Sequence, residues 1–415
     1  MNDAKSLQRG VTVQQKSLPL FWLGFWLLFI KFLWQATVVV PVDEMVLRVL
    51  LLWGMAFLAL RIAVLLPHYK RRVLVVGSLL VAAISYALSG ETVLLSTLLV
   101  VFAATGVGAQ KVIRAWCRAV APVLVLMLVC YGAAELMGET IGETFSDIGG
   151  LRDTRSALFF VHPNYCGAFF FSYAIGQCLR KDVSVPMKVI CYLGSLAVIY
   201  FITGSRTSTL SLLSYPVFAL ALRIAFGRIG ESAAKGMSII IVLVPVLLAV
   251  FTYWLGSYWF TSPMFSQGLS DLLTGRPALW WAQYNYAGLT LLGQPAFQGT
   301  VLVRGTYHEV ATVDGMYSSF LYNIGLVGFL CILILFYLWA RRAKSSELEL
   351  MSAAILALFL FGFCEWHAAN ALVCIPLLLL GDAVELQEPA TMTSTSALGS
   401  NAIRAPRQAS DTKGW

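Results

Sequence analysis

The sequence predicts an all-α polytopic membrane protein with about 12 transmembrane helices and one large extracytoplasmic loop. Of the 415 residues, 59% are apolar and 12% are charged, which is about half the charged share of a soluble domain. Many apolar runs approach the roughly 20 residues that a membrane-spanning helix needs. Basic residues alternate between the two ends of these runs. These observations exclude a soluble enzyme, a disordered chain and a nucleic-acid binder, despite the net charge of +8.

The apolar runs divide the chain into four parts. Nine predicted helices occupy residues 1–256 and three occupy 316–386, with a predicted extracytoplasmic loop at 257–315 between them. Residues 387–415 are rich in Ser, Thr, Ala and Pro without apolar periodicity, which predicts a disordered cytoplasmic tail. The twelve predicted helices lie near residues 18–40, 45–66, 73–89, 92–108, 117–137, 156–179, 186–203, 208–226, 236–256, 316–340, 349–366 and 370–384.

The distribution of Lys and Arg predicts the orientation of these helices. If the N-terminus is cytoplasmic, the seven inner segments hold three basic residues each, which is 21 of the 29. Three others (Lys31, Arg48 and Arg61) lie within predicted helices, and five lie on the outer side. Because basic residues are retained on the cytoplasmic side of a membrane, this count predicts an even number of spans and two cytoplasmic termini.

All five outer basic residues are arginines: Arg152, Arg155, Arg206, Arg276 and Arg304. A guanidinium binds phosphate or carboxylate through two parallel hydrogen bonds, whereas lysine acts as a mobile point charge. For Arg152 and Arg155, ion pairing with neighbouring acids is as good an explanation as an anionic ligand. The other three have few acids near them in the sequence, which favours an anionic ligand.

Two outer segments are longer than the other loops. Residues 138–155 are acidic and Gly-rich, and we expect a mobile cap there. The segment from Ser257 to Gly315 contains an amphipathic stretch, Leu272–Leu292, with several Trp and Tyr residues. A long loop between tightly connected helices is usually functional. Its aromatic residues could stack on sugar rings or form an interfacial belt, and both interpretations stay open.

Two polar motifs interrupt the predicted helices at the outer side. The Gly204-Ser205-Arg206 string lies at the end of a helical run. Backbone amides exposed there, beside a guanidinium, would bind a pyrophosphate. An arginine that only lies at the membrane interface would give the same sequence pattern. His162 and Asn164 flank a proline at membrane depth, where polar residues usually face a cavity unless they belong to a structural kink.

The large loop contributes a third group at the same side, which contains Arg276, Arg304, His308 and Asp314. No H-E-x-x-H, Asp-x-Asp or nucleotide-binding glycine pattern occurs in the sequence. Any catalysis is therefore expected to use side chains, without a metal or another cofactor. The eight cysteines form no C-x-x-C pair and are interpreted as small core residues.

These motifs resemble those of the Wzy-type O-antigen polymerase and O-antigen ligase superfamily, over residues 155–330. The 204–208 string resembles the family's Gly-Ser-Arg motif, and His162-Pro163-Asn164 resembles a motif of its polymerases. Residues 314–328 resemble its His-Asn-x-Tyr-Leu…Gly-Leu-x-Gly segment. The family's histidine position, however, falls on Asp314, eleven residues before Gly325. This departure favours a polymerase over a ligase.

The resemblance implies a bacterial inner-membrane glycosyltransferase of O-antigen, capsule or exopolysaccharide biosynthesis. Its inverting, metal-independent reaction would transfer a glycan from undecaprenyl pyrophosphate to a lipid-linked repeat unit, with a chain-length regulator as an optional partner. Asp314 is the first choice of general base by position and His308 the second by its ordinary pKa. Arg206 would stabilise the leaving group, together with Arg276 or Arg304. The remaining predicted substrate-binding residues are His162, Asn164 and Ser205.

Two alternatives remain open from the sequence. The first is an O-antigen ligase that passes the glycan to lipid A core or to protein. The second is a secondary transporter, which Lys31 and Arg48 within predicted helices favour because intramembrane charges often mark a transport pathway. The lack of an internal repeat argues against a transporter.

Overall fold

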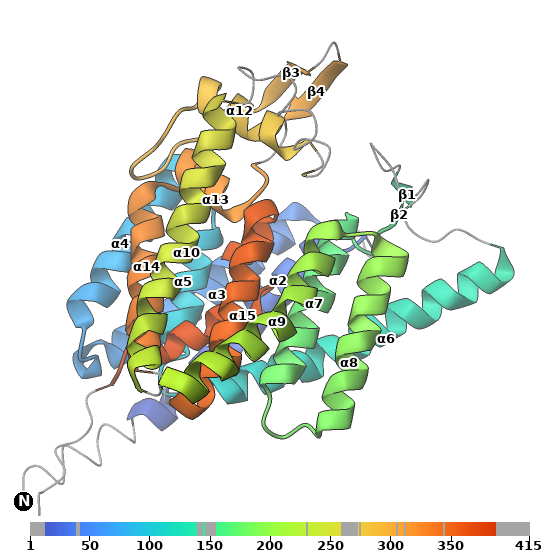
Figure 1. Cartoon of the computed structure of the whole chain (residues 1–415). Coiled ribbons are helices and arrows are strands. Elements are labelled where there is room, and N and C mark those ends of the chain that lie inside the picture. Colours follow the sequence, from blue (N-terminus) through green and yellow to red (C-terminus); the bar gives the residue numbers. More distant parts are fainter. Residues whose placement is uncertain are drawn as a thin grey trace, which may run out of the picture.

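The computed structural model describes most of the chain, and it is predominantly helical (Figure 1). The description covers residues 13–38, 42–138, 144–145, 155–229, 231–258, 273, 275–303, 306–310, 313–342 and 345–386. The predicted tail at 387–415, most of the predicted cap at 138–155 and residues 259–272 of the large loop lie outside the described residues.

Seven helices of the described chain are long and apolar enough to cross a membrane, as expected for a multi-pass membrane protein. They are α2 (Leu18–Ala36), α3 (Glu44–Leu65), α4 (Arg72–Ser89), α6 (Ala109–Met137), α8 (Val185–Ala197) continued by the π-helix η2 (Val198–Thr203), α9 (Arg206–Ile229) and α10 (Glu231–Tyr258). Shorter helices complete the bundle: α5 (Val93–Ala103), α7 (Pro163–Leu179), α14 (Leu326–Ala340) and α15 (Ser345–Cys364).

Smaller elements gather at one end of this bundle (Figure 1). There, α12 (Arg276–Tyr286) lies near the antiparallel hairpin β3–β4 (Gly299–Val303 and Thr306–Val310). A second short pair joins β1 (Thr144–Phe145) to β2 (Arg155–Ser156). The remaining elements are η1 (Leu66–His68), α13 (Met316–Ser319), the π-helix η3 (Phe320–Ile324), η4 (Trp366–Ala369) and η5 (Ile375–Ala383).

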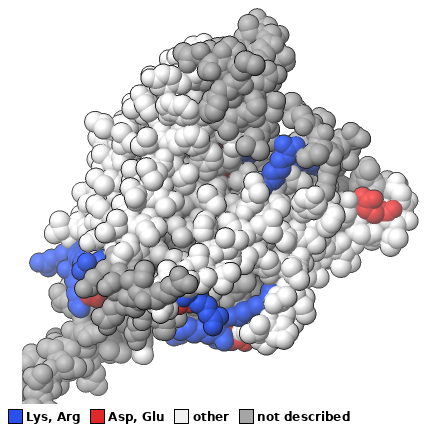
Figure 2. Space-filling model, in the orientation of Figure 1, with Lys and Arg blue, Asp and Glu red and all other residues white. Residues whose placement is uncertain are grey.

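The outer surface of the bundle is apolar, as a bilayer requires. Large aliphatic side chains such as Leu52, Leu126, Val217 and Val250 are more than half exposed. On the face shown in Figure 2, a broad band is almost free of charge, and basic residues gather along the lower edge. Because lipid tails are as apolar as these side chains, this surface is consistent with a lipid bilayer around the helices.

Charged residues from distant segments also form ion pairs. Glu385 pairs with Lys70 at 2.7 Å and with Arg342 at 3.4 Å. Asp182 likewise pairs with Arg180 at 2.8 Å, and also with Arg114 at 3.1 Å. The four basic residues belong to segments that the sequence predicts on one side of the membrane. Within each of these two clusters, the structure therefore brings together residues that the sequence predicts on the same side.

Three of the twelve predicted helices differ from a simple spanning helix. The predicted helix at 370–384 contains the 3-10 helix η5, which is largely buried inside the bundle. The predicted helix at 316–340 breaks at Gly325 into α13 with η3 on one side and α14 on the other. The run at 92–108 yields only the 11-residue α5. Apolar composition does not distinguish a buried irregular segment from a spanning helix, so the count of twelve stays a prediction.

Candidate active site

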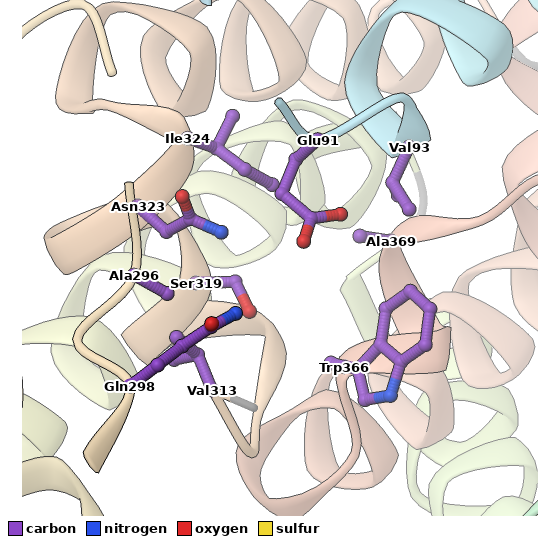
Figure 3. Close-up of a pocket in the computed structure, with 10 residues that line it drawn as sticks. All are labelled: Glu91, Val93, Ala296, Gln298, Val313, Ser319, Asn323, Ile324, Trp366 and Ala369. Atoms are coloured by element: carbon purple, nitrogen blue, oxygen red, sulfur yellow. The ribbon is translucent and has the colours of Figure 1, made fainter. Parts of the chain in front are cut away.

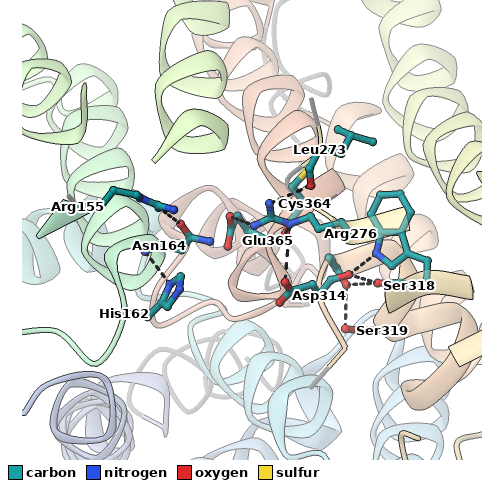
Figure 4. A network of polar contacts seen from close by, with 12 residues as sticks. Arg155, His162, Asn164, Leu273, Arg276, Asp314, Ser318, Ser319, Cys364 and Glu365 are labelled. Atoms are coloured by element: carbon teal, nitrogen blue, oxygen red, sulfur yellow. Dashed lines mark hydrogen bonds and ion pairs between the residues drawn. The ribbon is translucent and has the colours of Figure 1, made fainter. Parts of the chain in front are cut away.

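A network of polar side chains lies at the bundle end that carries α12 (Figures 1 and 4). Three stretches that are distant in the sequence contribute to it. The first runs from Arg155 to Asn164, the second joins Arg276 to Asp314, and the third is the Cys364–Glu365 pair at the end of α15. All three belong to segments that the sequence predicts on the outer side.

Arg276 occupies the centre of this network and is only 6% exposed. It begins α12 directly after a glycine, and its Nε donates to the carbonyl of Cys364 at 2.8 Å. Its terminal nitrogen donates to Oε1 of Glu365, also at 2.8 Å, and Nε lies 3.9 Å from Oδ2 of Asp314. A planar guanidinium presents several donors in fixed directions. It therefore holds two carboxylates from distant segments at once.

The two carboxylates differ in accessibility. Glu365 is 3% exposed, whereas the Asp314 side chain keeps 33% of its surface exposed. Burial raises the pKa of Glu365 to about 7, although Arg276 acts in the opposite direction. Burial also raises the pKa of Asp314, again against the effect of Arg276. Asp314 is thus the carboxylate that a substrate could reach. Glu365 holds the Arg276 guanidinium on the buried side of the network.

The backbone around Asp314 is held by several hydrogen bonds. The indole N–H of Trp280 donates to the Asp314 carbonyl at 2.6 Å, and the Ser318 hydroxyl donates to the same oxygen. Gly315 has a φ of +97°, and a Cβ there would lie 2.8 Å from the carbonyl oxygen of Phe363. A side chain at this position would therefore push the loop away from α15. Trp280 is fully buried in this structural role, so it neither stacks on a sugar nor belongs to an interfacial belt.

A second arginine approaches from β2. The Nε of Arg155 donates to the carbonyl of Thr203 at 3.1 Å, and its terminal nitrogen donates to Oδ1 of Asn164 at the same distance. Asn164 also contacts the Glu365 carboxylate. Arg155 is therefore connected to the centre of the network through a single amide side chain.

His162 caps the N-terminus of α7 beside this arginine. Its Nδ1 accepts a hydrogen bond from the backbone N–H of Asn164 at 3.1 Å. Burial lowers the pKa of His162 to about 4, with smaller contributions from Arg155 and Arg276. The ring is thus kept neutral, which its role as a hydrogen-bond acceptor requires.

The Gly204-Ser205-Arg206 string borders the network at the start of α9. Gly204 adopts a φ of +58°, and a Cβ there would lie 3.2 Å from Cγ of Arg155. The string follows the π-helix η2, and such local irregularities are frequent at functional sites. Arg206 is half-buried and is the first residue of α9, and the next residue, Thr207, contacts the Cys364 side chain.

Ser205 has a different environment from its neighbour. Its side chain is buried, and its Oγ lies 2.8 Å from the hydroxyl of Ser208. Both hydroxyls pack against Gly167 of α7, where a Cβ would lie 2.5 Å from Oγ of Ser208. In the structure, Ser205 therefore joins α9 to α7 beside the network.

The structure brings together four of the predicted site residues: His162, Asn164, Arg276 and Asp314. His308 lies in β4 opposite Val301, but its side chain is outside the described part of the chain, as is all of Arg304. Sequence reasoning missed Glu365 and left Arg155 undecided. The available signal for Glu365 was a carboxylate near the outer end of the apolar run at 349–366, where a charge is costly unless it has a partner.

A pocket of about 80 Å³ adjoins the network (Figure 3). Val313 and Trp366, which line it, are the direct neighbours of Asp314 and Glu365 in the sequence. The other lining residues are Glu91, Val93, Ala296, Gln298, Ser319, Asn323, Ile324 and Ala369. The site therefore has two adjoining parts, an arginine–carboxylate network and a pocket without a basic residue in its described lining.

Comparison with known proteins gives no match to any family model, to any curated protein or to any solved structure.

Proposed function

We propose that this chain is a glycosyltransferase of the bacterial cytoplasmic membrane, with both termini in the cytoplasm. As a polymerase, it transfers an O-antigen, capsule or exopolysaccharide glycan from undecaprenyl pyrophosphate to a lipid-linked repeat unit. The observation that carries the proposal is the bridge formed by buried Arg276 between Glu365 and the accessible Asp314, with Arg155 connected to it. This arrangement combines cationic groups with a reachable carboxylate, as a phosphate-leaving transfer needs.

The arginines act on the donor in this mechanism. When the glycosyl bond breaks, negative charge develops on the pyrophosphate, and preorganised guanidinium groups stabilise that charge. Arg276 is held in position by Glu365, and Arg155 by the Thr203 carbonyl and Asn164. These two arginines balance the two carboxylates of the network in charge. Arg206, at the start of the adjacent helix, adds the positive charge that favours an anionic donor.

Asp314 acts on the acceptor. Its carboxylate accepts the proton of an acceptor hydroxyl while that oxygen forms a bond with the anomeric carbon of the donor sugar. The bond between the anomeric carbon and the phosphate oxygen breaks, and undecaprenyl pyrophosphate leaves with the electron pair. Attack from the face opposite the leaving group inverts the configuration. A raised pKa makes Asp314 a stronger base than an ordinary aspartate.

The test replaces Arg206. Arg206→Ala is expected to abolish long-chain glycan in cells and in vesicles that contain purified protein and lipid-linked repeat units. Removing one such donor from a transition state costs about 100- to 1,000-fold in rate. Arg206→Lys should recover little, because a single point charge does not replace two parallel hydrogen bonds. Normal chain lengths in the alanine variant, at wild-type protein levels, would contradict the proposal.

Two further measurements separate the polymerase from the alternatives. Deletion of a polymerase leaves single repeat units on the final acceptor, whereas deletion of a ligase leaves polymer on the lipid carrier. For a transporter, purified protein in liposomes would move substrate across the membrane without any glycosyl transfer.

A further inference from the structure

The pocket beside the network has a lining suited to a different kind of ligand from pyrophosphate. Its ten described lining residues include one carboxylate, two amides, one hydroxyl and one indole, but neither Lys nor Arg. The carboxylate of Glu91 points into the space, with the Trp366 ring at one side and Asn323 at another (Figure 3). A pocket of this composition disfavours an anion and offers hydrogen bonds to a neutral polar ligand.

Asn323 is a buried polar residue at one side of the pocket. The residue is 3% exposed, and its Oδ1 has no hydrogen-bond partner within the described part of the chain. Its side chain contacts the carboxylate of Glu91, so the amide is held in place. A buried acceptor without a partner costs about 1–3 kcal/mol. In Figure 3 the amide nitrogen of Asn323 points toward Glu91 and the space between them, so it is the group that a ligand hydroxyl would meet.

The other polar groups of the pocket are fixed by the fold. The backbone N–H of Glu91 donates to the Ser89 hydroxyl at 3.0 Å, at the connection between α4 and α5. Ser319 donates to the Gly315 carbonyl at 2.9 Å, which leaves its oxygen lone pairs as acceptors. Trp366 provides a half-buried aromatic ring. A carboxylate, an amide and an aromatic face together match the hydroxyls and the apolar C–H face of a sugar ring.

The pocket and the network share two stretches of backbone. Val313 lines the pocket, and its neighbour Asp314 belongs to the network. In the same way, Trp366 lines the pocket and its neighbour Glu365 belongs to the network. Consecutive Cα atoms lie about 3.8 Å apart. The pocket and the network therefore lie on either side of the same two stretches of backbone.

We propose that this pocket binds the acceptor, by receiving one edge of the uncharged terminal sugar of the lipid-linked repeat unit beside the network that contains Asp314. Glu91 and Asn323 recognise the neighbouring hydroxyls, and Trp366 packs against the ring. The inference rests on the proposed polymerase function and adds the substrate class for the acceptor half of the site. It makes Glu91, Asn323 and Trp366 positioning residues that determine which sugar is extended.

The experiment measures sugar binding separately from transfer. The probe is the repeat-unit oligosaccharide released from the host's lipid carrier by mild acid, titrated into the purified full chain in lipid nanodiscs. Glu91→Gln, which keeps the shape of the side chain, and Trp366→Ala are each expected to weaken binding about 10-fold or more. The matched control is Glu44→Gln, which changes an exposed carboxylate at the start of α3 outside the pocket. It should leave both binding and transfer unchanged.

Transfer assays then give a second readout. In Glu91→Gln, the KM for the lipid-linked acceptor should rise about 10-fold while the KM for the donor stays as in the wild type. A free neutral monosaccharide should inhibit competitively against the acceptor, and the corresponding uronic acid should inhibit at least 10-fold more weakly, because the described lining contains the Glu91 carboxylate and neither Lys nor Arg. A thermal melt of each variant confirms that the fold is retained.

The outcomes distinguish this inference from the proposed function. If glycan is polymerised but Glu91→Gln and Trp366→Ala change neither oligosaccharide binding nor the acceptor KM, the pocket is not the acceptor site, while the polymerase proposal stands. Uronic acid inhibition equal to that of the neutral sugar also overturns the inference. If the wild type binds the oligosaccharide through Glu91 but performs no transfer, the polymerase proposal fails and the pocket remains a sugar-binding site.

Discussion

Two buried arginines lie at opposite ends of the bundle and have different partners. Arg61 in α3 is 0% exposed and donates to the carbonyls of Ala103 at 2.6 Å and Thr105 at 3.4 Å, and to the Ser17 hydroxyl at 3.1 Å. Arg276 is nearly as buried, but two of its partners are carboxylates. Burial of an arginine therefore does not by itself indicate a functional site; the chemistry of its partners does.

The difference has a physical basis. Backbone carbonyls near the end of α5 are fixed acceptors that would otherwise be unpaired, so Arg61 satisfies a helix end and joins three segments. The Arg276 network instead contains titratable groups, one of which is accessible to a ligand. The proposed function requires an anionic ligand to enter that network, whereas the partners of Arg61 contain no titratable group.

The largest effect is expected for Arg276→Met. Loss of the guanidinium should lower the rate of glycan transfer at least 100-fold, because one preorganised donor to the leaving group is gone. Glu365 would also be left as an unpaired buried carboxylate, which typically destabilises a protein by about 3–5 kcal/mol. Transfer is measured in vesicles with lipid-linked repeat units, and stability by the melting temperature.

The double variant Arg276→Met with Glu365→Gln separates these two effects. Removing both charges should restore most of the melting temperature, since no buried charge is left without a partner. The transfer activity should stay lost. Recovery of transfer in the double variant would mean that Arg276 acts only on stability, and the contrast with Arg61 would disappear.

The second prediction applies the same substitution to the other arginine. Arg61→Met leaves two backbone carbonyls and the Ser17 hydroxyl without their donor, at a cost of about 1–3 kcal/mol for each group that becomes unsatisfied. We expect a melting temperature several degrees lower and transfer per folded molecule within about two-fold of the wild type. An inactive Arg61→Met protein with an unchanged melting temperature would show that both arginines are functional.

Part of this contrast could be predicted from the sequence. Counting charges on alternate sides placed Arg276 and Asp314 at the same face, and in the structure they lie 3.9 Å apart. The count depends only on the alternation of helices across a membrane, which is why it does not need exact helix boundaries. It assigned Arg61 to the interior of a helix but gave no indication of its partners.

The remainder depends on tertiary contacts that sequence patterns do not encode. Glu365 stands at the end of an apolar run, and only the approach of α12 shows that Arg276 neutralises it. Likewise, the π-helix η3 and the break at Gly325 separate α13 from α14, whereas apolar composition suggested one continuous helix. The Glu91 pocket was not predicted, because its lining comes from four segments with no common motif.

The smallest predicted effect concerns His162, whose ring is kept neutral by burial, with smaller contributions from Arg155 and Arg276. Its pKa is about 4 in the fold and near 6.5 in an unfolded chain, so between these pH values the unfolded state binds more protons. Stability should therefore fall as the pH decreases from about 6.5 to 4.

His162→Asn keeps a side-chain acceptor at the N-cap and removes this titration. Melting temperatures of the two proteins should be similar at pH 7.5, and the wild type should become the less stable by a few degrees at pH 4.5. Parallel pH profiles would show that burial does not keep the His162 ring neutral in the fold.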